Sequence, residues 1–355
     1  MNSDFLEALY DLEKEKGIAS DVLLDAIEAA LVSAYKKNFG SSENVRVTID
    51  RTNGTFNVFS RREVTEEVTD PRRQIALNEA RAIDPRYDIA NIVETEVTPR
   101  NFGRIAAQTA KQVVVQRIRE AERSIIFDEY VNREGDIVTG IVQRQELKNI
   151  YIDLGKAEAI LAPTEQIPGE IYKHGDRIKT YIVEVKKTTK GPQILVSRTH
   201  PGLLKRLFEL EVPEVYDGVI ELKSIAREAG ARSKVSAYSV DPNIDPVGAC
   251  VGPKGARVQN IVNELNGEKI DIVKWDADPT VFVANALSPS KVIKVEVAPE
   301  GNLARVVVPD YQLSLAIGKE GQNARLAAKL TNMKIDIKSE SQITGIGSEE
   351  LIKEE

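Results

Sequence analysis

Gly-Pro-Lys-Gly at residues 252–255 and Gly-Lys-Glu-Gly at residues 318–321 are two copies of one short pattern in the C-terminal half of this 355-residue chain. Helix-forming sequence precedes and follows both copies, and each then reaches the same tetrapeptide, Lys-Ile-Asp-Ile, at residues 269–272 and 334–337. Four residues repeat easily by chance, whereas a whole unit of this length does not. The pattern therefore indicates a duplicated supersecondary module.

The glycines at both ends of each loop suit contact with a bulky ligand. Glycine reaches positive φ and has no Cβ to obstruct a ligand, and the helix that follows presents free N–H groups and its positive dipole end. Lys254 and Lys319 add a cation to each loop. A lone Gly-x-x-Gly usually does no more than join two helices, but two copies in equivalent contexts favour a loop that holds a nucleic-acid backbone.

The order of elements around the loops resembles a KH module of the prokaryotic kind, in which such a loop clamps about four nucleotides. Apolar periodicity predicts helix, two strands, short helix, loop, helix and strand in each copy. In the first copy these elements are Leu203–Glu211, Val219–Ile225, Ser233–Ser239, Gly248–Val251, Ala256–Leu265 and Ile270–Lys274. In the second they are Val281–Leu287, Val292–Ala298, Leu303–Val308, Leu313–Ile317, Gln322–Leu330 and Lys334–Lys338.

Composition excludes several classes of function. The chain has one cysteine and two histidines, so neither a disulfide nor a standard zinc site is expected. Neither the Walker spacing nor the Rossmann glycine spacing is present. No apolar run approaches a membrane span, and the acidic N-terminus has no secretory pattern. We expect a cytoplasmic protein with no cofactor, no bound metal and no contact with a membrane.

The net charge of −7 is concentrated in the first 130 residues and after residue 339. Residues 131–339 are nearly neutral, so we expect them to bind RNA through a local stripe of positive charge, with modest affinity and a small dependence on salt.

The motifs Gly-Asp-Ile-Val at residues 135–138, Ile-Tyr-Ile-Asp-Leu-Gly at 150–155, His-Gly-Asp-Arg-Ile-Lys at 174–179 and Ile-Leu-Val-Ser-Arg at 194–198 follow one another here. Their layout over residues 131–199 resembles the S1 RNA-binding domain. The alternation between glycine, proline and charged turns predicts five strands, the number of an OB-type barrel. In Ile150-Tyr151-Ile152 the tyrosine points away from the isoleucines, so Tyr151 offers a stacking surface for a base or is an ordinary surface tyrosine. The predicted strands are Ile137–Val142, Ile150–Leu154, Ala159–Ala162, Arg177–Val185 and Gln193–Ser197.

The first 130 residues predict a mixed α/β domain without catalytic features. Ser20 is the expected N-cap of an amphipathic helix, and a hairpin turning at Asn53-Gly54 follows it. A short helix and a strand at residues 92–97 are expected past Pro71 and Pro85, and then a long helix over residues 101–130.

Taken in order, these segments resemble one family, the bacterial transcription termination/antitermination factors NusA. The most specific motifs are Gly-Arg-Ile-Ala-Ala-Gln-Thr-Ala-Lys-Gln-Val from residue 103 and Val-Gly-Pro-Lys-Gly-Ala-Arg-Val-Gln from residue 251. The resemblance implies a multidomain α+β protein with a mixed N-terminal domain, a five-stranded OB-fold S1 barrel and two tandem type II KH domains. The boundaries expected are 1–130, 131–199, 200–277, 278–345 and a flexible acidic tail, 346–355.

The same resemblance implies the partners. Residues 1–130 would bind RNA polymerase, the S1 and KH domains would hold nascent single-stranded RNA, and other Nus factors would join in antitermination. The linker around residues 276–280 is too short for the KH modules to tumble independently, so we expect a rigid pair that reads one continuous RNA segment. A monomer is expected because no coiled-coil seam or large apolar stripe is present.

The predicted RNA contacts are of three kinds. The loop glycines and lysines would touch phosphate and sugar, neighbouring side chains would line the groove for bases, and Arg257 and Arg325 either reach a phosphate or are solvated surface. Glu320 lowers the charge of the second loop, so contacts from backbone N–H groups would dominate there. The full set is Tyr151, Val251, Gly252, Pro253, Lys254, Gly255, Ala256, Arg257, Ile317, Gly318, Lys319, Glu320, Gly321, Gln322 and Arg325.

Three alternatives stay open at the level of sequence. An RNA-processing enzyme also carries S1 and KH modules, although the first 130 residues show no cluster of carboxylates or histidines. A ribosome-associated RNA-binding factor would co-sediment with ribosomes rather than with polymerase. A scaffold with purely structural loops would tolerate loop substitutions without loss of RNA binding.

Overall fold

The computed structural model of the protein describes residues 7, 9–11, 13–14, 18–39, 44–50 and 54–343. The chain divides into two compact units, Met1–Ile125 and Ile126–Glu355. The predicted acidic tail and Asn53 of the predicted turn lie outside the described residues. In the described part of the chain, no helix combines the length and the apolar character that crossing a membrane requires.

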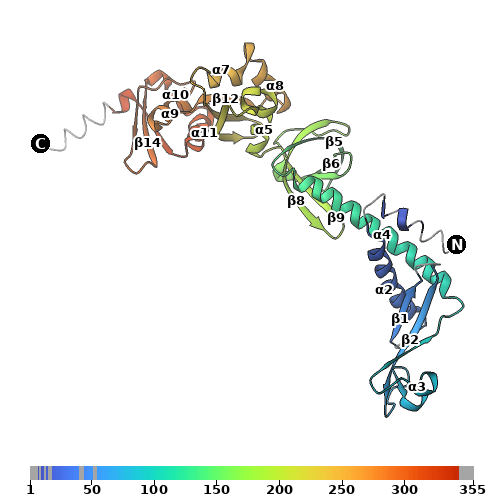
Figure 1. The fold of residues 1–355 in the computed structure, drawn as a ribbon. Coiled ribbons are helices and arrows are strands. Elements are labelled where there is room, and N and C mark those ends of the chain that lie inside the picture. Colours follow the sequence, from blue (N-terminus) through green and yellow to red (C-terminus); the bar gives the residue numbers. More distant parts are fainter. Residues whose placement is uncertain are drawn as a thin grey trace. The chain divides into compact units, whose positions relative to one another are not determined.

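The first unit is a mixed α/β domain, as predicted, and its sheet has four strands where the sequence predicted three (Figure 1). Its core joins Leu23, Ile27 and Leu31 of a helix to Val47 and Val58 of the sheet, all fully or almost fully buried. The elements are α2 (Ser20–Phe39), β1 (Val45–Ile49), β2 (Phe56–Thr65), β3 (Gln74–Ala76), α3 (Leu77–Ile83), β4 (Ile92–Glu96) and α4 (Phe102–Val131).

Three local predictions for this unit differ from the structure. Ser20 is the first residue of α2 rather than its cap, because the Ala19 carbonyl already accepts from the N–H of Leu23. The second strand of the hairpin, which the sequence predicts over residues 55–59, continues to Thr65 because β2 pairs with β3 and β4 as well as with β1. The short helix α3 precedes Pro85 instead of following it.

The second unit begins with the predicted five-stranded barrel. Its closed order is β5-β6-β7-β9-β8. Ile150 and Ile152 point into the barrel with almost no exposure, as the alternation in the sequence requires. The strands are β5 (Ile137–Glu146), β6 (Asn149–Asp153), β7 (Glu158–Leu161), β8 (Arg177–Thr188) and β9 (Gly191–Ser197).

The two KH modules share one topology, which confirms the predicted duplication. Each sheet has one antiparallel and one parallel pair, in the orders β10-β11-β12 and β13-β14-β15. The first module holds α5 (Pro201–Glu211), α6 (Pro213–Tyr216), β10 (Ile220–Glu228), β11 (Arg232–Ser239), α7 (Pro246–Val251), α8 (Ala256–Glu264) and β12 (Lys269–Lys274). The second holds α9 (Pro279–Ala286), β13 (Lys294–Val297), β14 (Leu303–Val308), α10 (Leu313–Ile317), α11 (Gln322–Thr331) and β15 (Lys334–Ser339).

A buried ion pair of the barrel lies at the junction with the first module. Arg198, at the end of β9, is 2.6 Å from Glu170, and their side chains are 1% and 3% exposed. The guanidinium also donates to the carbonyl oxygens of Lys179 and Glu264. Because separating the Arg198 guanidinium from these partners would leave a buried charge unpaired, the contacts oppose movement at this junction.

The second module packs on the first through a shared core. Ala226 and Val273 of the first sheet belong to the same buried cluster as Val283 and Leu326 of the second module. Lys234, fully buried in the first sheet, donates to the Ser288 carbonyl oxygen at 2.7 Å. Burial lowers the pKa of this lysine although Asp271 lies beside it. The modules therefore do not tumble independently, as the short linker predicts.

Candidate nucleic-acid interface

The two Gly-x-x-Gly loops have the same backbone conformation. The first glycine has φ 76° and ψ 173° in Gly252, and φ 76° and ψ 174° in Gly318. The third position is left-handed in both loops although neither residue is glycine, with φ 52° at Lys254 and φ 53° at Glu320. Two different sequences thus reach one shape, in which the outgoing helix presents its first N–H groups next to the loop.

Close packing explains the first glycine of each loop. A Cβ on Gly252 would lie 2.6 Å from Cγ of Arg257, and a Cβ on Gly318 would lie 2.8 Å from the backbone nitrogen of Asn323. Both conformations also belong to a region that residues other than glycine hardly adopt. By contrast, a Cβ on Gly321 would meet nothing within 4 Å.

Each loop is fastened by the second residue of its outgoing helix. Arg257 Nη1 donates to the Ala249 carbonyl oxygen at 2.7 Å and to Glu214 Oε2 at 3.0 Å. Asn323 Nδ2 donates to the Ala316 carbonyl oxygen at 3.0 Å and, across the module, to that of Leu287 at 3.1 Å. In both cases the side chain holds the end of the incoming helix.

Asn323 is a residue that the sequence reasoning missed. Superposing the repeats on their glycines pairs Arg257 with Asn323 and not with Arg325, the residue predicted to act like Arg257. That register was the signal that could have found it. Asn323 is 5% exposed, so its role is to shape the loop.

The predicted contacts Gln322 and Arg325 are both engaged by the first module. Arg325 Nε lies 2.6 Å from Glu228 Oε1, and Gln322 Nε2 donates to Glu228 Oε2 at 2.9 Å. The hydrogen bond from Arg325 lowers the pKa of the Glu228 carboxyl against the effect of burial. Like Arg257, these side chains would have to release a protein partner before binding RNA.

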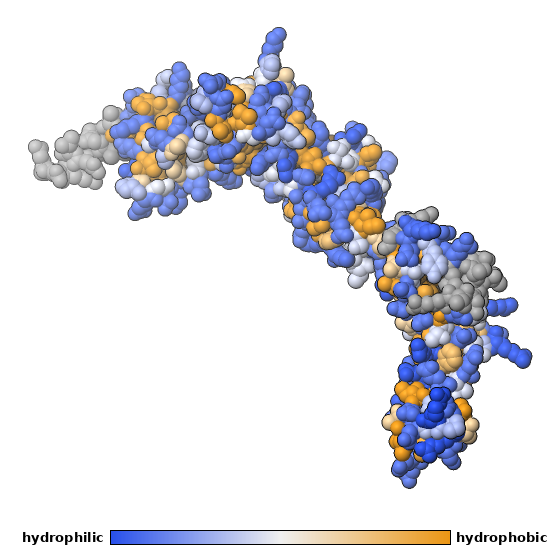
Figure 2. All heavy atoms as spheres, in the orientation of Figure 1, coloured by the Kyte–Doolittle hydropathy of each residue, from blue (hydrophilic) through white to orange (hydrophobic). Residues whose placement is uncertain are grey.

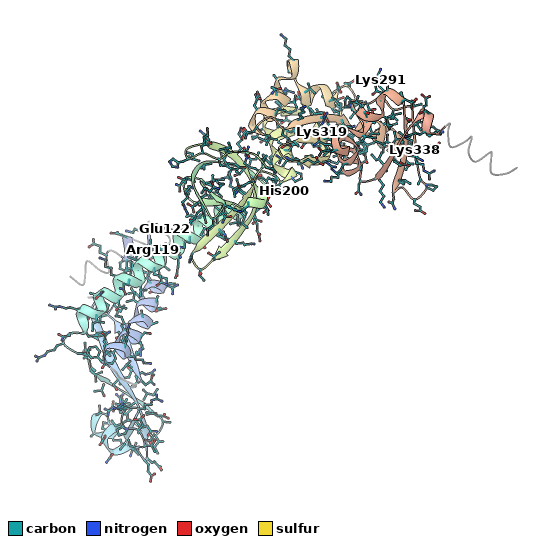
Figure 3. All side chains as sticks on the ribbon, turned by 180° about the vertical axis from the view of Figure 1, so that it is seen from behind. Arg119, Glu122, His200, Lys291, Lys319 and Lys338 are labelled. Atoms are coloured by element: carbon teal, nitrogen blue, oxygen red, sulfur yellow. The ribbon has the colours of Figure 1, made fainter. Side chains whose placement is uncertain are left out.

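The remaining loop residues are accessible. Pro253, Lys254, Ala256, Ile317, Lys319 and Glu320 are exposed, while Val251, Gly252, Gly255, Gly318 and Gly321 are half-buried. Lys319, labelled in Figure 3, extends from the second loop. Each loop thus exposes one lysine, but only the second also exposes a carboxylate.

Tyr151 in the barrel lies outside the core between Ile150 and Ile152, as predicted. The Arg144 guanidinium covers its ring at 4.1 Å from the centroid, and Arg144 is itself paired with Glu158. A base stacking on that face would replace Arg144, or would stack on the guanidinium in turn.

Cys250 lies inside the first module, next to its loop. The side chain is fully buried, and burial raises the pKa of the thiol to about 12. The thiolate is therefore scarce at neutral pH, and Cys250 acts as a small apolar core residue.

Comparison with known families matches successive segments of the chain. Residues 4–124 match the NusA N-terminal domain, and residues 132–197 match the S1 RNA binding domain. Residues 198–275 and 279–344 match the NusA-like first and second KH domains. The predicted fold class is thereby confirmed.

Similar proteins cover nearly the whole chain. The transcription termination/antitermination protein NusA of Halalkalibacterium halodurans is 66% identical over 347 residues, which are 98% of this chain and 91% of the relative. NusA of Bacillus subtilis is 64% identical over 98% of this chain and 94% of its own length. NusA of Thermus thermophilus is 43% identical over 98% and 92%. The chain belongs to the NusA family of transcription termination/antitermination proteins.

Proposed function

We propose that this protein is a transcription elongation factor that holds nascent single-stranded RNA while bound to RNA polymerase. The observation that carries the RNA-binding part is the pair of loops with one backbone shape in two rigidly joined modules. The relatives, named as termination/antitermination proteins, support the role in transcription. Residues 1–130 would bind the polymerase.

The two loops would bind RNA by different means. In the first, Lys254 would neutralise a phosphate while the N–H groups at the start of α8 bind a neighbouring oxygen. In the second, Glu320 offsets Lys319, so the N–H groups at the start of α11 would carry most of the contact. Val251, Pro253, Ala256 and Ile317 would line the path of the bases.

The rigid junctions would then set the effect on transcription. Because barrel and modules do not move independently, one continuous stretch of transcript would be held in an extended form. We infer that this lengthens pauses, assists hairpins at intrinsic terminators and, with other Nus factors, supports antitermination. The protein would act without catalysis or cofactor, in the cytoplasm and as a monomer.

A single-round transcription assay tests the proposal. Bacterial RNA polymerase would transcribe a template with a hairpin pause and an intrinsic terminator, with the intact chain or with residues 126–355 added. The fragment starts at residue 126 because Tyr130 is 3% exposed in the barrel core. We expect altered pausing or termination with the intact chain only. No effect from either, with RNA binding retained, would instead favour the ribosome-associated alternative.

A further inference from the structure

An aromatic cluster with a cation lies at the end of the first sheet. Tyr238 on β11 and Trp275 after β12 meet edge to face at 5.3 Å between ring centroids. Lys223 Nζ on β10 lies 5.1 Å and 5.5 Å from the two centroids. Tyr238 is 37% exposed, whereas Trp275 is partly buried and packs against the core of the second module.

The two rings border a cavity of about 650 Å³. Its other walls come from the segment that leads from β11 into α7 and from the residues after β12. Figure 2 shows hydrophobic residues gathered over α7 and β12 on the side in view. The volume falls in the range of small-molecule sites, and a single nucleotide fits within it.

Two carboxylates in the lining favour a ligand that donates hydrogen bonds to the cavity. Asp241 Oδ1 accepts from the N–H of Asn243, and Asp276 Oδ1 accepts from the N–H of Asp278. Within the described part of the chain, no donor is bound to either Oδ2 atom. Carboxylates repel a phosphate but accept from the exocyclic amino group of a base.

The location connects the cavity to the first loop. Pro246, the first residue of α7, lines the cavity, and Gly252 of the loop caps the other end of that helix. Six helical residues span about 9 Å, and roughly three stacked nucleotides cover that length at 3.4 Å each. An RNA strand held at the loop thus reaches the cavity with about three further nucleotides.

We propose that this cavity binds one unpaired base of the same RNA, against Tyr238 and Trp275, and prefers adenine, cytosine or guanine to uracil. The inference rests on the proposed function. Lys223, which lies over the rings and pairs with Glu221, would sit beside the RNA backbone. The cavity would add base selectivity that loops contacting backbone do not supply.

The chain offers a direct probe, because Trp275 is its one tryptophan. The full chain would be titrated with labelled oligo(A), oligo(C) and oligo(U) of about 12 nucleotides, three times the length that one loop clamps. Anisotropy of the label reports binding anywhere on the protein, and tryptophan fluorescence reports the cavity. Tyr238→Ala removes one ring, and Tyr216→Ala is the matched control, since Tyr216 is 77% exposed in the same module and outside the cavity.

We expect oligo(A) and oligo(C) to quench Trp275 more than oligo(U) does. Tyr238→Ala should weaken their binding about fivefold to tenfold, in keeping with the loss of one stacked base, and Tyr216→Ala less than twofold. The proposal that the cavity binds a base would be wrong if RNA bound without changing the tryptophan fluorescence and the two variants had equal affinities. The proposed function would then still stand. Absence of RNA binding would overturn both. Quenching by an arginine-rich peptide but not by RNA would identify a protein site instead.

Discussion

The two KH modules hold the same loop with different side chains. The backbone angles agree within a few degrees, yet the residue that fastens the loop is Arg257 in one and Asn323 in the other. The third position is a lysine in one and a glutamate in the other. Backbone shape is therefore the common property, and charge is free to differ.

This contrast separates two contributions to binding RNA. Backbone N–H groups require the shape alone, whereas side-chain cations set affinity and its dependence on salt. Substitutions that break the shape should therefore be costly in both modules. Substitutions that change charge should be mild and opposite in sign.

The largest effect is expected from Gly318→Asp. The new side chain would meet the backbone nitrogen of Asn323, add strain of about 1–3 kcal/mol at this backbone conformation, and place a negative charge where phosphate binds. We expect RNA affinity in a filter-binding assay to fall at least tenfold, about 1.4 kcal/mol. Gly252→Asp should also weaken binding, because its Cβ would meet the base of the Arg257 side chain that fastens the first loop.

Gly321→Asn is the matched control for that substitution. Its φ of 75° is left-handed, which asparagine tolerates, and nothing lies within 4 Å of the new Cβ. The variant should keep its fold and lose less RNA affinity than Gly318→Asp, because it adds a side chain without a clash and without a charge. Unchanged RNA affinity in Gly318→Asp would refute the role of the second loop.

The next largest effect is expected from Asn323→Ala. It leaves the buried carbonyl oxygens of Ala316 and Leu287 without this donor and should lower the free energy of unfolding by about 2 kcal/mol. Arg257→Ala should cost about 1 kcal/mol, since the Arg257 side chain is 27% exposed and water can replace it. Urea unfolding measures both values. Equal losses would contradict the distinction between a buried and a half-exposed fastening.

The side chains that hold the loops and modules together could not be predicted from the sequence. The strands and helices of the barrel and modules follow from apolar periodicity, which depends on near neighbours and is visible in the chain. The pair of Arg325 with Glu228 and the contacts of Arg198 with Glu170 and Glu264 join residues far apart in sequence. No local pattern marks such partners. The loop glycines could thus be predicted, but the protein contacts of Arg257, Gln322 and Arg325 could not.

Changing the charge of either loop should have a moderate effect on RNA affinity. Glu320→Lys should raise RNA affinity about threefold and steepen the logarithmic salt dependence by about 0.7, the value for one phosphate contact on a single strand. Lys254→Glu should do the reverse in the first loop. Binding measured across a salt series tests both, with Glu300→Lys as a control at an exposed site in the second module. If Glu300→Lys gives the same gain, the effect comes from net charge rather than from the loop.

The smallest effect concerns how each outgoing helix is anchored. The end of α8 contacts the barrel through buried Arg198, whereas α11 contacts the first module through Arg325 and Glu228, whose side chains are 48% and 21% exposed. Glu228→Gln should therefore lower stability by only about 0.2–1 kcal/mol. Calorimetry at neutral pH measures this difference, and Glu296→Gln, which breaks a pair within β13, is the control.

The pH dependence of the stability loss in Glu228→Gln tests whether this loss is electrostatic. The folded-state pKa of Glu228 is lowered, chiefly by the hydrogen bond from Arg325. The unfolded chain therefore takes up the proton first as pH falls, so the stabilisation is complete above the ordinary glutamate pKa and disappears as pH drops through the folded value. Glu228→Gln and the parent chain should then unfold at different temperatures at pH 7 and converge in acid. If the difference in unfolding temperature persisted in acid, Glu228 would stabilise the contact between α11 and the first module through packing rather than through its charge.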